Sequence, residues 1–486
     1  MEKHLIVIVA LLLSIGLSGC IDLFQNNNEI NDEEATIPGI EWFQTGNNHT
    51  MTYLQPKPSQ ELEDNRIGFH AHCFYTPEGQ GIFPDGVLNA SYVLELGVKR
   101  ARLAINTMDA PDPDDLIGVT DHLPELSIDP EHDEFITTLA DNGITITYVL
   151  SFWDMEGHSR GVEVGIPRFK TEDEIQRYLD FVQFIVHHFK DRIQYYEIWN
   201  EPTIKDTIQW IEVEDYINLV KRTVPIILQE YPDAKIVVGG TSSLFPYWGG
   251  GNDTESKDYL FSILRSDIMP LVDVVSWHPM YGSSPEYNWH RRYYYEYPSI
   301  VQEIKDVAST HGFTGEYVAD EIHWCTPDLP SGGWPTHSET KSGKYLTRGI
   351  MMHRGMNVTV TQLLLLYKPN LYKTSQNLCT VMAGAQPVSL PLEIESNATN
   401  IRNYSFSLPN GDMLVALWTD GVAVDNDTGV RANLAIQNIT SEVVTGIDVL
   451  EGFQQPITMS NENGNLTIQN LIVRDYPMIL HIVKFV

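Results

Sequence analysis

The feature that most restricts the fold of this 486-residue chain is a series of apolar runs that alternate with longer segments. From about residue 65 the runs recur eight times, and helical or loop stretches separate them, which is typical of repeated strand-helix units. Strands with near-continuous apolar character are typical of parallel sheets covered by helices, and eight such units close most economically into a barrel. The predicted strands span residues 66–74, 98–106, 144–153, 195–200, 235–241, 272–278, 316–321 and 358–367.

Helices are predicted between these strands, over residues 172–189, 213–229 and 299–310. Gly97, Gly143 and Gly315 stand just before strands, where a helix-ending glycine is expected. An open, doubly wound sheet is the alternative architecture. It is disfavoured because no glycine-rich phosphate loop follows the first strand.

The sequence pattern changes after about residue 385, where short alternating runs are separated by Asn-Gly and Asp-Gly turns. This pattern predicts an all-β domain, which we expect to be a sandwich, and residues 40–53 are a candidate additional strand of it. The predicted division is a signal segment over 1–20, a polar connecting segment over 21–60, a barrel over 61–385 and a β-sandwich over 386–486.

The N-terminus has the pattern of an export signal, with Lys3 before an apolar run over residues 5–17. Leu17-Ser18-Gly19-Cys20 resembles the lipobox of prokaryotic lipoproteins, which implies lipidation of Cys20 and anchoring to the outer face of the cell membrane. An ordinary secretory signal that contains a cysteine is the alternative. The Asn-, Asp- and Glu-rich residues 21–37 then predict a flexible tether.

The composition restricts the partners of the chain. A formal net charge of −34 argues against nucleic acid or an anionic membrane surface. Apart from Cys20, the cysteines are Cys73, Cys325 and Cys379, which allow one disulfide and one free thiol and have no zinc-site spacing. We therefore expect no metal and no cofactor, and we infer no protein partner.

One stretch, residues 195–202, carries the most chemical information. An aromatic strand ends there in Asn200, Glu201 and Pro202. Successive strand residues point to opposite faces, so Asn200 and Glu201 share one pocket only if regular pairing stops, and Pro202 supports that stop because it has no N–H. Taken alone, a solvated strand-end glutamate is the ordinary interpretation.

A second carboxylate changes that interpretation. In barrels of this kind the active site is built at the carboxyl ends of the strands. Glu201 ends the fourth predicted strand, and Asp320 and Glu321 end the seventh, so they face each other across the mouth. Strand alternation places Glu321 with Ala319 and Tyr317 on one face. Two such carboxylates can flank a glycosidic bond, one donating a proton and one attacking the anomeric carbon.

The Asn200-Glu201-Pro202 stretch, together with Glu321, resembles glycoside hydrolase clan A, the retaining glycosidases built on a (β/α)8 barrel. The resemblance covers about residues 65–370, and many members also carry a C-terminal β-sandwich. It implies that Glu201 is the acid/base, Glu321 the nucleophile and Asn200 a hydrogen-bond partner of the sugar 2-hydroxyl. The expected activity is hydrolysis of an extracellular oligo- or polysaccharide by double displacement.

Further residues match the clan. Arg102 on the second strand occupies the place of an arginine that keeps the nucleophile ionised, although a structural ion pair with Glu197 is the alternative. His278 and Tyr281 follow the sixth strand as a His/Tyr pair does in the clan, in which the residue matching Tyr281 binds the nucleophile. The clan's tryptophan at the end of the eighth strand is missing, so we expect the substrate-binding residues Tyr367 or Trp324 to form the floor under the sugar.

Two other classes remain open. His70-Ala71-His72 on the first strand is the paired-ligand pattern of zinc-dependent amidohydrolase-type barrels, and His278 ends the sixth strand, but no further ligand follows on the fourth, fifth or eighth strand. A surface lipoprotein that binds glycans without catalysis is the second alternative. A pure binder would not need both carboxylates.

Overall fold

The computed structural model of the chain describes residues 36–37, 41–72, 89–104, 119–120, 126–128, 130–152, 166–205, 209–245, 255–328, 334–363 and 368–484. Its larger part is a ring of eight parallel strands: β3 (Ile67–His72), β4 (Arg100–Ala104), β7 (Thr145–Leu150), β8 (Tyr195–Ile198), β9 (Lys235–Thr241), β10 (Val274–Trp277), β12 (Glu316–His323) and β13 (Thr359–Leu363). Pairing of β13 with β3 and of β10 with β12 closes the ring. The predicted eight-stranded barrel is confirmed.

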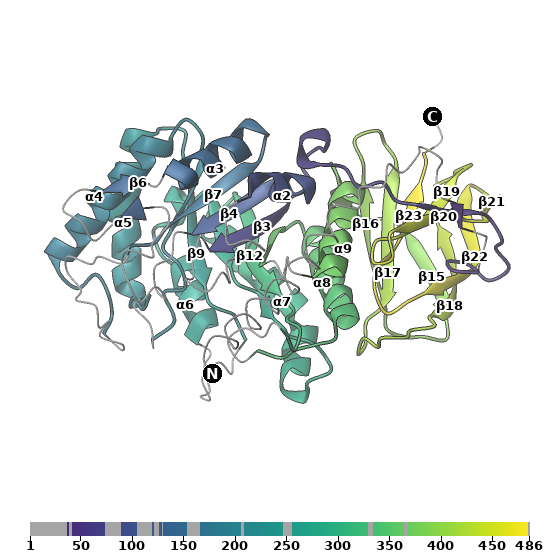
Figure 1. Cartoon of the computed structure of the whole chain (residues 1–486). Coiled ribbons are helices and arrows are strands. Elements are labelled where there is room, and N and C mark those ends of the chain that lie inside the picture. The colour runs from purple at the N-terminus through teal and green to yellow at the C-terminus, as the bar shows by residue number, and fades with distance from the viewer. Residues whose placement is uncertain are drawn as a thin grey trace, which may run out of the picture.

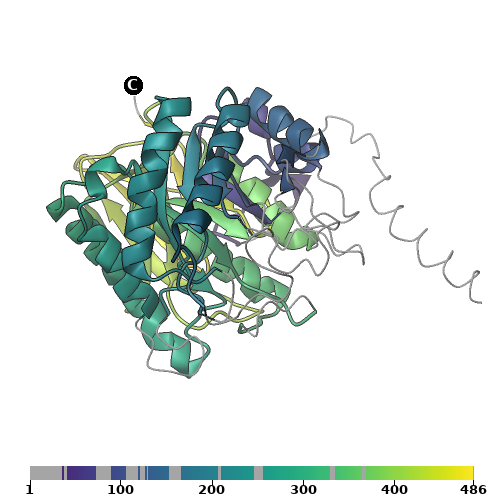
Figure 2. The same ribbon diagram turned by 90° about the vertical axis from the view of Figure 1, so that its left-hand side faces the viewer.

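Helices lie around this ring (Figure 1), and Figure 2 shows them in front of the sandwich strands. None of the helices in the described ranges is long and apolar enough to cross a membrane. The helices are α2 (Ala90–Glu95), α3 (Pro130–Asp141), α4 (Glu172–Phe189), α5 (Val213–Glu230), α6 (Glu255–Leu264), α7 (Asn288–Thr310), α8 (Glu339–Gly355) and α9 (Pro369–Val381), with one-turn helices η1 (Ser59–Glu61) and η3 (Met269–Leu271). Three short strands complete this part: β5 (Val119–Thr120), β6 (Ser127–Ile128) and β11 (Met280–Tyr281).

Two predicted helices, α4 and α5, have almost the predicted bounds, because each has a clear amphipathic period. In contrast, α7 begins at Asn288, well before the predicted start, and runs through Pro298. Its added turns bury Tyr293, Tyr294 and Tyr297 against the rest of the molecule. Tertiary packing of these rings therefore sets the start of the helix.

Two of the predicted helix-ending glycines have the required backbone. Gly97 and Gly143 have φ values of 81° and 75°. The prediction for Gly315 is wrong, because Gly312, with φ of 86°, follows α7 in its place. Gly315 serves another purpose, since a Cβ there would lie 1.9 Å from the main-chain oxygen of Asp273. It allows two neighbouring segments to approach closely.

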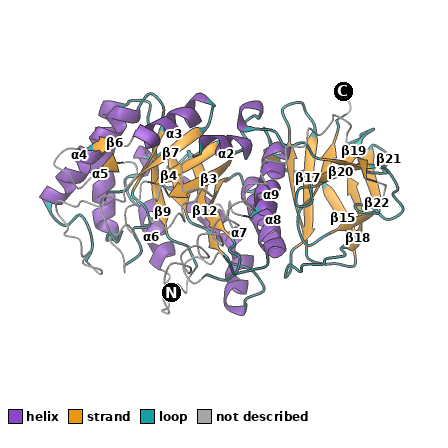
Figure 3. Ribbon diagram, viewed as in Figure 1, coloured by secondary structure: helices purple, strands orange, loops and turns teal. Residues whose placement is uncertain are grey.

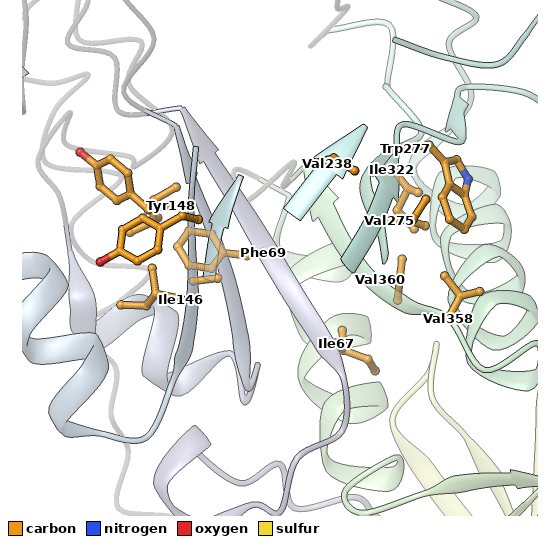
Figure 4. Packing of buried hydrophobic residues seen from close by; sticks show 14 of the residues in the cluster. Ile67, Phe69, Ile146, Tyr148, Val238, Val275, Trp277, Ile322, Val358 and Val360 are labelled. Carbon is orange, nitrogen blue, oxygen red and sulfur yellow. The ribbon is translucent and has the colours of Figure 1, made fainter. Parts of the chain in front are cut away.

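The barrel strands present different chemistry on their two faces. Outward-facing apolar side chains such as Ile146, Val238 and Val360 pack in the layer between strands and helices (Figure 4). The interior includes a cavity of about 20 Å³, lined by apolar side chains such as Val237, Val274 and Val318 and by polar ones. Its lining includes Arg102, Thr147, Glu197, Ser276, Asp320 and Thr361. Apolar packing against the helices thus holds together a ring whose centre is charged.

The C-terminal part consists of strands in two antiparallel sheets (Figure 3). One sheet contains β14 (Gln386–Val388), β16 (Ile401–Ser407), β17 (Met413–Thr419), β19 (Val444–Asp448), β20 (Phe453–Pro456) and β23 (Met478–Ile482). The other contains β15 (Leu392–Ser396), β18 (Val430–Ile436), β21 (Ser460–Glu462) and β22 (Asn465–Val473). Val415 and Leu417 of the first sheet share one buried cluster with Leu434 and Ile468 of the second, which makes the pair of sheets a sandwich.

The chain before the barrel adds to this sandwich. β1 (Thr36–Ile37) pairs with β2 (Met51–Tyr53), and β2 pairs with β20. Phe43 and Met51 are buried, with exposures of 1% and 0%. This part of the predicted connecting segment is therefore integrated into the C-terminal domain. The predicted signal segment and Cys20 lie outside the described residues.

Helices α8 and α9 lie between the barrel and the sandwich (Figure 1). The Lys344 ammonium pairs with Asp475 at 2.7 Å, and Arg348 donates to the main-chain oxygens of Gly421 at 2.6 Å and Asp475 at 2.8 Å. These buried polar contacts join the two domains. Cys325 and Cys379 are both buried, whereas Cys73 lies outside the described part of the chain.

Candidate active site

The Asn200-Glu201 stretch lies where β8 ends and the backbone leaves strand geometry. Trp199 and Glu201 have φ values of 71° and 44°, in the left-handed region that residues other than glycine seldom adopt. The main-chain N–H of Glu201 donates to the oxygen of Gly240 at 2.7 Å. Strand pairing stops after Ile198, two residues before the predicted end of the strand. The Asn200 side chain contacts Arg102 of β4, and the Glu201 side chain contacts His278, which follows β10.

Packing of the Trp199 side chain stabilises this left-handed backbone. Its indole is 2% exposed, lies edge-on to Phe169 with ring centres 5.0 Å apart, and receives the Arg168 guanidinium at 5.1 Å. The indole N–H donates to the main-chain oxygen of Gln209 at 2.7 Å. Close packing holds the left-handed conformation in place, and with it the positions of the two polar residues that follow.

A β-bulge brings the second carboxylate into the site. The register of β12 against β13 shifts between Ala319 and Ile322, so Asp320 and Glu321 together occupy one bulge. Asp320 lines the barrel interior, whereas Ala319 packs in the outer apolar layer. The predicted grouping of Glu321 with Ala319 and Tyr317 is therefore wrong. The bulge reverses the alternation, so Ile322 packs outward (Figure 4) and Glu321 joins Asp320 on the inner side.

The carboxylates of Glu201 and Glu321 meet at one imidazole. Nδ1 of His278 lies 3.0 Å from Oε1 of Glu201 and 3.5 Å from Oε2 of Glu321. The two oxygens are therefore no more than about 6.5 Å apart, a limit that includes the roughly 5–5.5 Å of retaining glycosidases. Side-chain exposures of 16% and 9% leave both groups partly open to solvent.

His278 is buried, and its charge is set by its neighbours. Burial alone lowers the pKa of the imidazole, but the nearby carboxylates of Glu321, Asp320 and Glu201 raise it to about 9. His323 on β12 has the opposite response, because burial lowers its pKa to about 4. At neutral pH the site therefore holds an imidazolium between the two carboxylates and a neutral imidazole beside them.

The sequence leaves open whether Arg102 pairs with Glu197 or with Glu321, and the structure shows contacts with both. Its guanidinium donates to both carboxylate oxygens of Glu197, at 2.8 and 2.9 Å, and to Oδ1 of Asn200 at 2.8 Å. Its distance to Oε2 of Glu321 is 3.7 Å. Arg102 therefore pairs first with Glu197 and orients Asn200, and its charge acts on Glu321 from slightly farther away.

Asp320 is a carboxyl group that sequence reasoning noted only as a neighbour of Glu321. It lies 3.4 Å from Nε of Arg102 and 3.6 Å from Nε2 of His278, and its side chain is 2% exposed. Burial and the nearby Glu197 carboxylate raise the pKa of Asp320 to about 7, against the lowering effect of the two cations. Asp320 continues the alternation of Glu316 and Val318, which also line the interior, and the bulge adds Glu321 on the same side.

The other predicted substrate-binding residues have different outcomes. Trp324 is 2% exposed, stacks on Tyr345 at 6.4 Å and donates its N–H to Ser283 O at 3.0 Å. It therefore packs the interior and is not available as a sugar floor, which corrects the prediction. The backbone of Tyr281, in β11, pairs with that of His323 in β12. The Tyr281 side chain lies outside the described part of the structure, as does the whole of Tyr367.

His70 belongs to the same cluster of side chains. Its Nδ1 lies 3.1 Å from the main-chain oxygen of Arg102, and its Nε2 lies 3.6 Å from Oε2 of Glu321. His70 therefore lies beside the carboxylate of Glu321, the predicted nucleophile. In the part of the chain that the structure describes, no group of three or more His, Cys, Asp or Glu side chains has the arrangement of a metal site.

Gln209 is a polar side chain that sequence reasoning missed altogether. It is 3% exposed and contacts both Asn200 and Glu201. It follows the Asn200-Glu201 stretch in a loop, where no periodicity or motif distinguishes it from a solvated glutamine. Spatial proximity alone identifies it.

Known structures share this architecture. A family 39 glycoside hydrolase from Bacteroides cellulosilyticus superposes with a TM-score of 0.58 at 14% identity, over 90% of this chain and 84% of that one. A bifunctional glucanase-xylanase from a metagenome library has a TM-score of 0.57 at 11% identity, over 89% and 98% of the two chains. A family 51 α-L-arabinofuranosidase from Bifidobacterium longum has a TM-score of 0.54 at 12% identity, over 88% and 98%.

At these identities the similarity establishes the fold, an eight-stranded parallel barrel with a β-sandwich after it. No protein-family model and no curated protein matches the sequence. Two of the structures named above are described as members of families 39 and 51, and the third as a glucanase-xylanase. The chain therefore shares its architecture with several families of these enzymes.

Proposed function

We propose that this protein is a retaining glycoside hydrolase. The observation that carries the proposal is the convergence of Glu201 and Glu321 on Nδ1 of His278, within 3.0 and 3.5 Å. Two partly open carboxyl groups from opposite sides of a barrel can flank one glycosidic bond. The glycoside hydrolases of the same fold support this choice among barrel chemistries.

In the first step, an oxygen of ionised Glu321 attacks the anomeric carbon of the sugar. The bond to the leaving oxygen breaks, that oxygen keeps the electron pair, and it takes the proton of Glu201. In the second step, Glu201 accepts a proton from water, whose oxygen attacks the anomeric carbon. The bond to Glu321 breaks, and its electron pair restores the carboxylate.

The surrounding charges fit these roles. Arg102 at 3.7 Å and protonated His278 at 3.5 Å favour the ionised form of the attacking carboxylate of Glu321. Asn200, oriented by Arg102, has a second amide hydrogen to offer a sugar hydroxyl. Glu201 has the more exposed carboxyl group, as exchange of a proton with the leaving group and then with water requires.

The decisive experiment compares Glu321→Ala with the wild-type enzyme on 4-nitrophenyl glycosides of several sugars and on polysaccharides such as xylan, mannan and xyloglucan. We expect the variant to lose turnover by at least about 10³-fold. Added azide should restore cleavage in it and give a glycosyl azide of inverted configuration. Undiminished activity of the variant would refute the role of Glu321. No hydrolysis by the wild type would favour the non-catalytic glycan binder.

We further propose that the enzyme is exported and held at the outer face of the cell membrane by lipid on Cys20, where it acts on an extracellular oligo- or polysaccharide. The resemblance of Leu17-Ser18-Gly19-Cys20 to a lipobox supports this location. Metabolic labelling with a radioactive fatty acid should mark the wild-type chain and leave Cys20→Ala unlabelled. Equal labelling of both chains would contradict the assignment.

A further inference from the structure

Gln209 lies against the Asn200-Glu201 stretch and contacts both of its side chains. Gln209 is 3% exposed, and its main-chain oxygen accepts the Trp199 indole N–H at 2.7 Å. Two residues later, the N–H of Ile211 donates to the main-chain oxygen of Pro202 at 2.9 Å. The backbone of this segment therefore holds the Gln209 side chain close to the carboxyl group of Glu201.

The direction of the hydrogen bonds around Gln209 is determined by Arg102. A guanidinium only donates, so the Asn200 atom that lies 2.8 Å from Arg102 Nη2 has to be the amide oxygen. The amide nitrogen of Asn200 then donates to Oε1 of Gln209 at 2.7 Å. Since Oε1 of Gln209 is the acceptor, its Nε2 remains to donate, and it lies 3.4 Å from Oε2 of Glu201.

These contacts form a directed chain that runs from the Glu197–Arg102 ion pair through Asn200 and Gln209 to Glu201. His278 contacts the other oxygen of the same carboxyl group, Oε1, at 3.0 Å. Glu201 is therefore held from two sides, by an imidazole at one oxygen and by an amide at the other. Rotation of its carboxyl group would break one of these contacts.

We propose that Gln209 is a positioning residue for the acid/base Glu201, fixing the orientation of its carboxyl group through one N–H and the orientation of Asn200 through its oxygen. The proposal rests on the proposed function. An N–H that donates to a carboxylate favours its ionised form, so a variant without this donor should have the alkaline limb of its kcat/KM profile at higher pH than the wild type. Loss of orientation slows the steps in which Glu201 transfers a proton.

The test uses three variants. Gln209→Ala removes both contacts, whereas Gln209→Glu keeps an oxygen for Asn200 and replaces the N–H with a second carboxylate beside Glu201. Thr203→Val is the matched control from the same loop, because the Thr203 hydroxyl lies 2.6 Å from Ser242 Oγ and has a structural role there. Each variant is assayed with phenyl and 2,4-dinitrophenyl glycosides of the sugar that the wild type cleaves.

Gln209→Ala should lower kcat/KM about 10- to 100-fold for the phenyl glycoside, which needs a proton donor, and by less than about 3-fold for the dinitrophenyl glycoside, which does not. The alkaline limb of its kcat/KM profile should move to higher pH. In Gln209→Glu that limb should move farther, because a like charge lies beside Glu201. Thr203→Val should keep the wild-type limb and the wild-type dependence on the leaving group.

Equal losses on both glycosides, with the alkaline limb unmoved, would overturn the proposal and leave Gln209 as part of the packing. Wild-type behaviour of Gln209→Glu would show that the contact with Asn200 alone matters, which also overturns it. The proposed function fails in a different way. In that case the wild type itself cleaves neither glycoside, whatever residue occupies position 209.

Discussion

Replacement of Glu197 by Gln should destabilise the barrel strongly, because it breaks a buried ion pair and leaves one charge behind. Both partners are almost inaccessible, with side-chain exposures of 1%, and two hydrogen bonds of 2.8 and 2.9 Å join them. In Glu197→Gln an amide N–H2 or a single neutral oxygen faces the guanidinium of Arg102. Removal of one member of a buried pair costs about 3–5 kcal/mol of unfolding free energy, and the Asp320 carboxyl group, 3.4 Å from Nε of Arg102, offsets part of that cost.

The measurement is urea unfolding at pH 7, followed by tryptophan fluorescence, since Trp199, Trp277 and Trp324 are all buried in the barrel. The matched control is Arg222→Met, which breaks a pair of the same two-bond geometry, 2.6 and 2.7 Å, on the surface. Because solvent screens that pair, the control should unfold like the wild type. A loss below about 1 kcal/mol in Glu197→Gln would refute the argument that burial makes the Arg102 pair indispensable.

Three further outcomes are expected. Protonation of His278 stabilises the fold fully below its unfolded-state pKa of about 6.5, and this contribution is lost as the pH rises through about 9. The unfolding free energy of the wild type should therefore fall between these two pH values, and that of His278→Gln should fall less. Trp324→Ala should lower the unfolding free energy by about 3–5 kcal/mol, because it empties a buried site, yet leave KM for an aryl glycoside nearly unchanged; a large rise in KM would restore Trp324 as a sugar floor. Gly312→Ala should lower the unfolding free energy by about 1–2 kcal/mol, because this residue has a left-handed backbone. Gly315→Ala should lower it by more, since its Cβ would lie 1.9 Å from the main-chain oxygen of Asp273. Equal unfolding midpoints of the two variants in urea would contradict that ranking.

The strand count and the location of Glu201 could be predicted because both depend on local patterns. Apolar runs separated by longer segments recur eight times, and the fourth strand, β8, ends at Ile198, close to its predicted end at Asn200. The start of α7 could not be predicted, because Pro298 and the many polar residues before it hide the burial of the tyrosines.

Strand alternation groups Glu321 with the wrong neighbours on its strand. An uninterrupted strand has a period of two, so a single extra residue moves every later side chain to the opposite face. The bulge at Asp320 and Glu321 is such an extra residue, and it explains how one strand supplies two successive inward carboxyl groups. Trp324 is buried against Tyr345 of α8, the next helix along the chain, and no pattern within the strand indicates that contact.

The sequence by itself determined the architecture and the two strand ends near Glu201 and Glu321, because hydrophobic periodicity acts over a few residues. Only the tertiary structure decided which charges pair. Arg102 binds Glu197 before Glu321, Asp320 shares the interior with them, and Gln209 reaches Glu201 from a loop. The contacts of Arg102 and Asp320 depend on register and packing between strands far apart in the chain, and no local pattern encodes such distances. The contact of Gln209 with Glu201 is close in sequence, but no periodicity or motif indicates it.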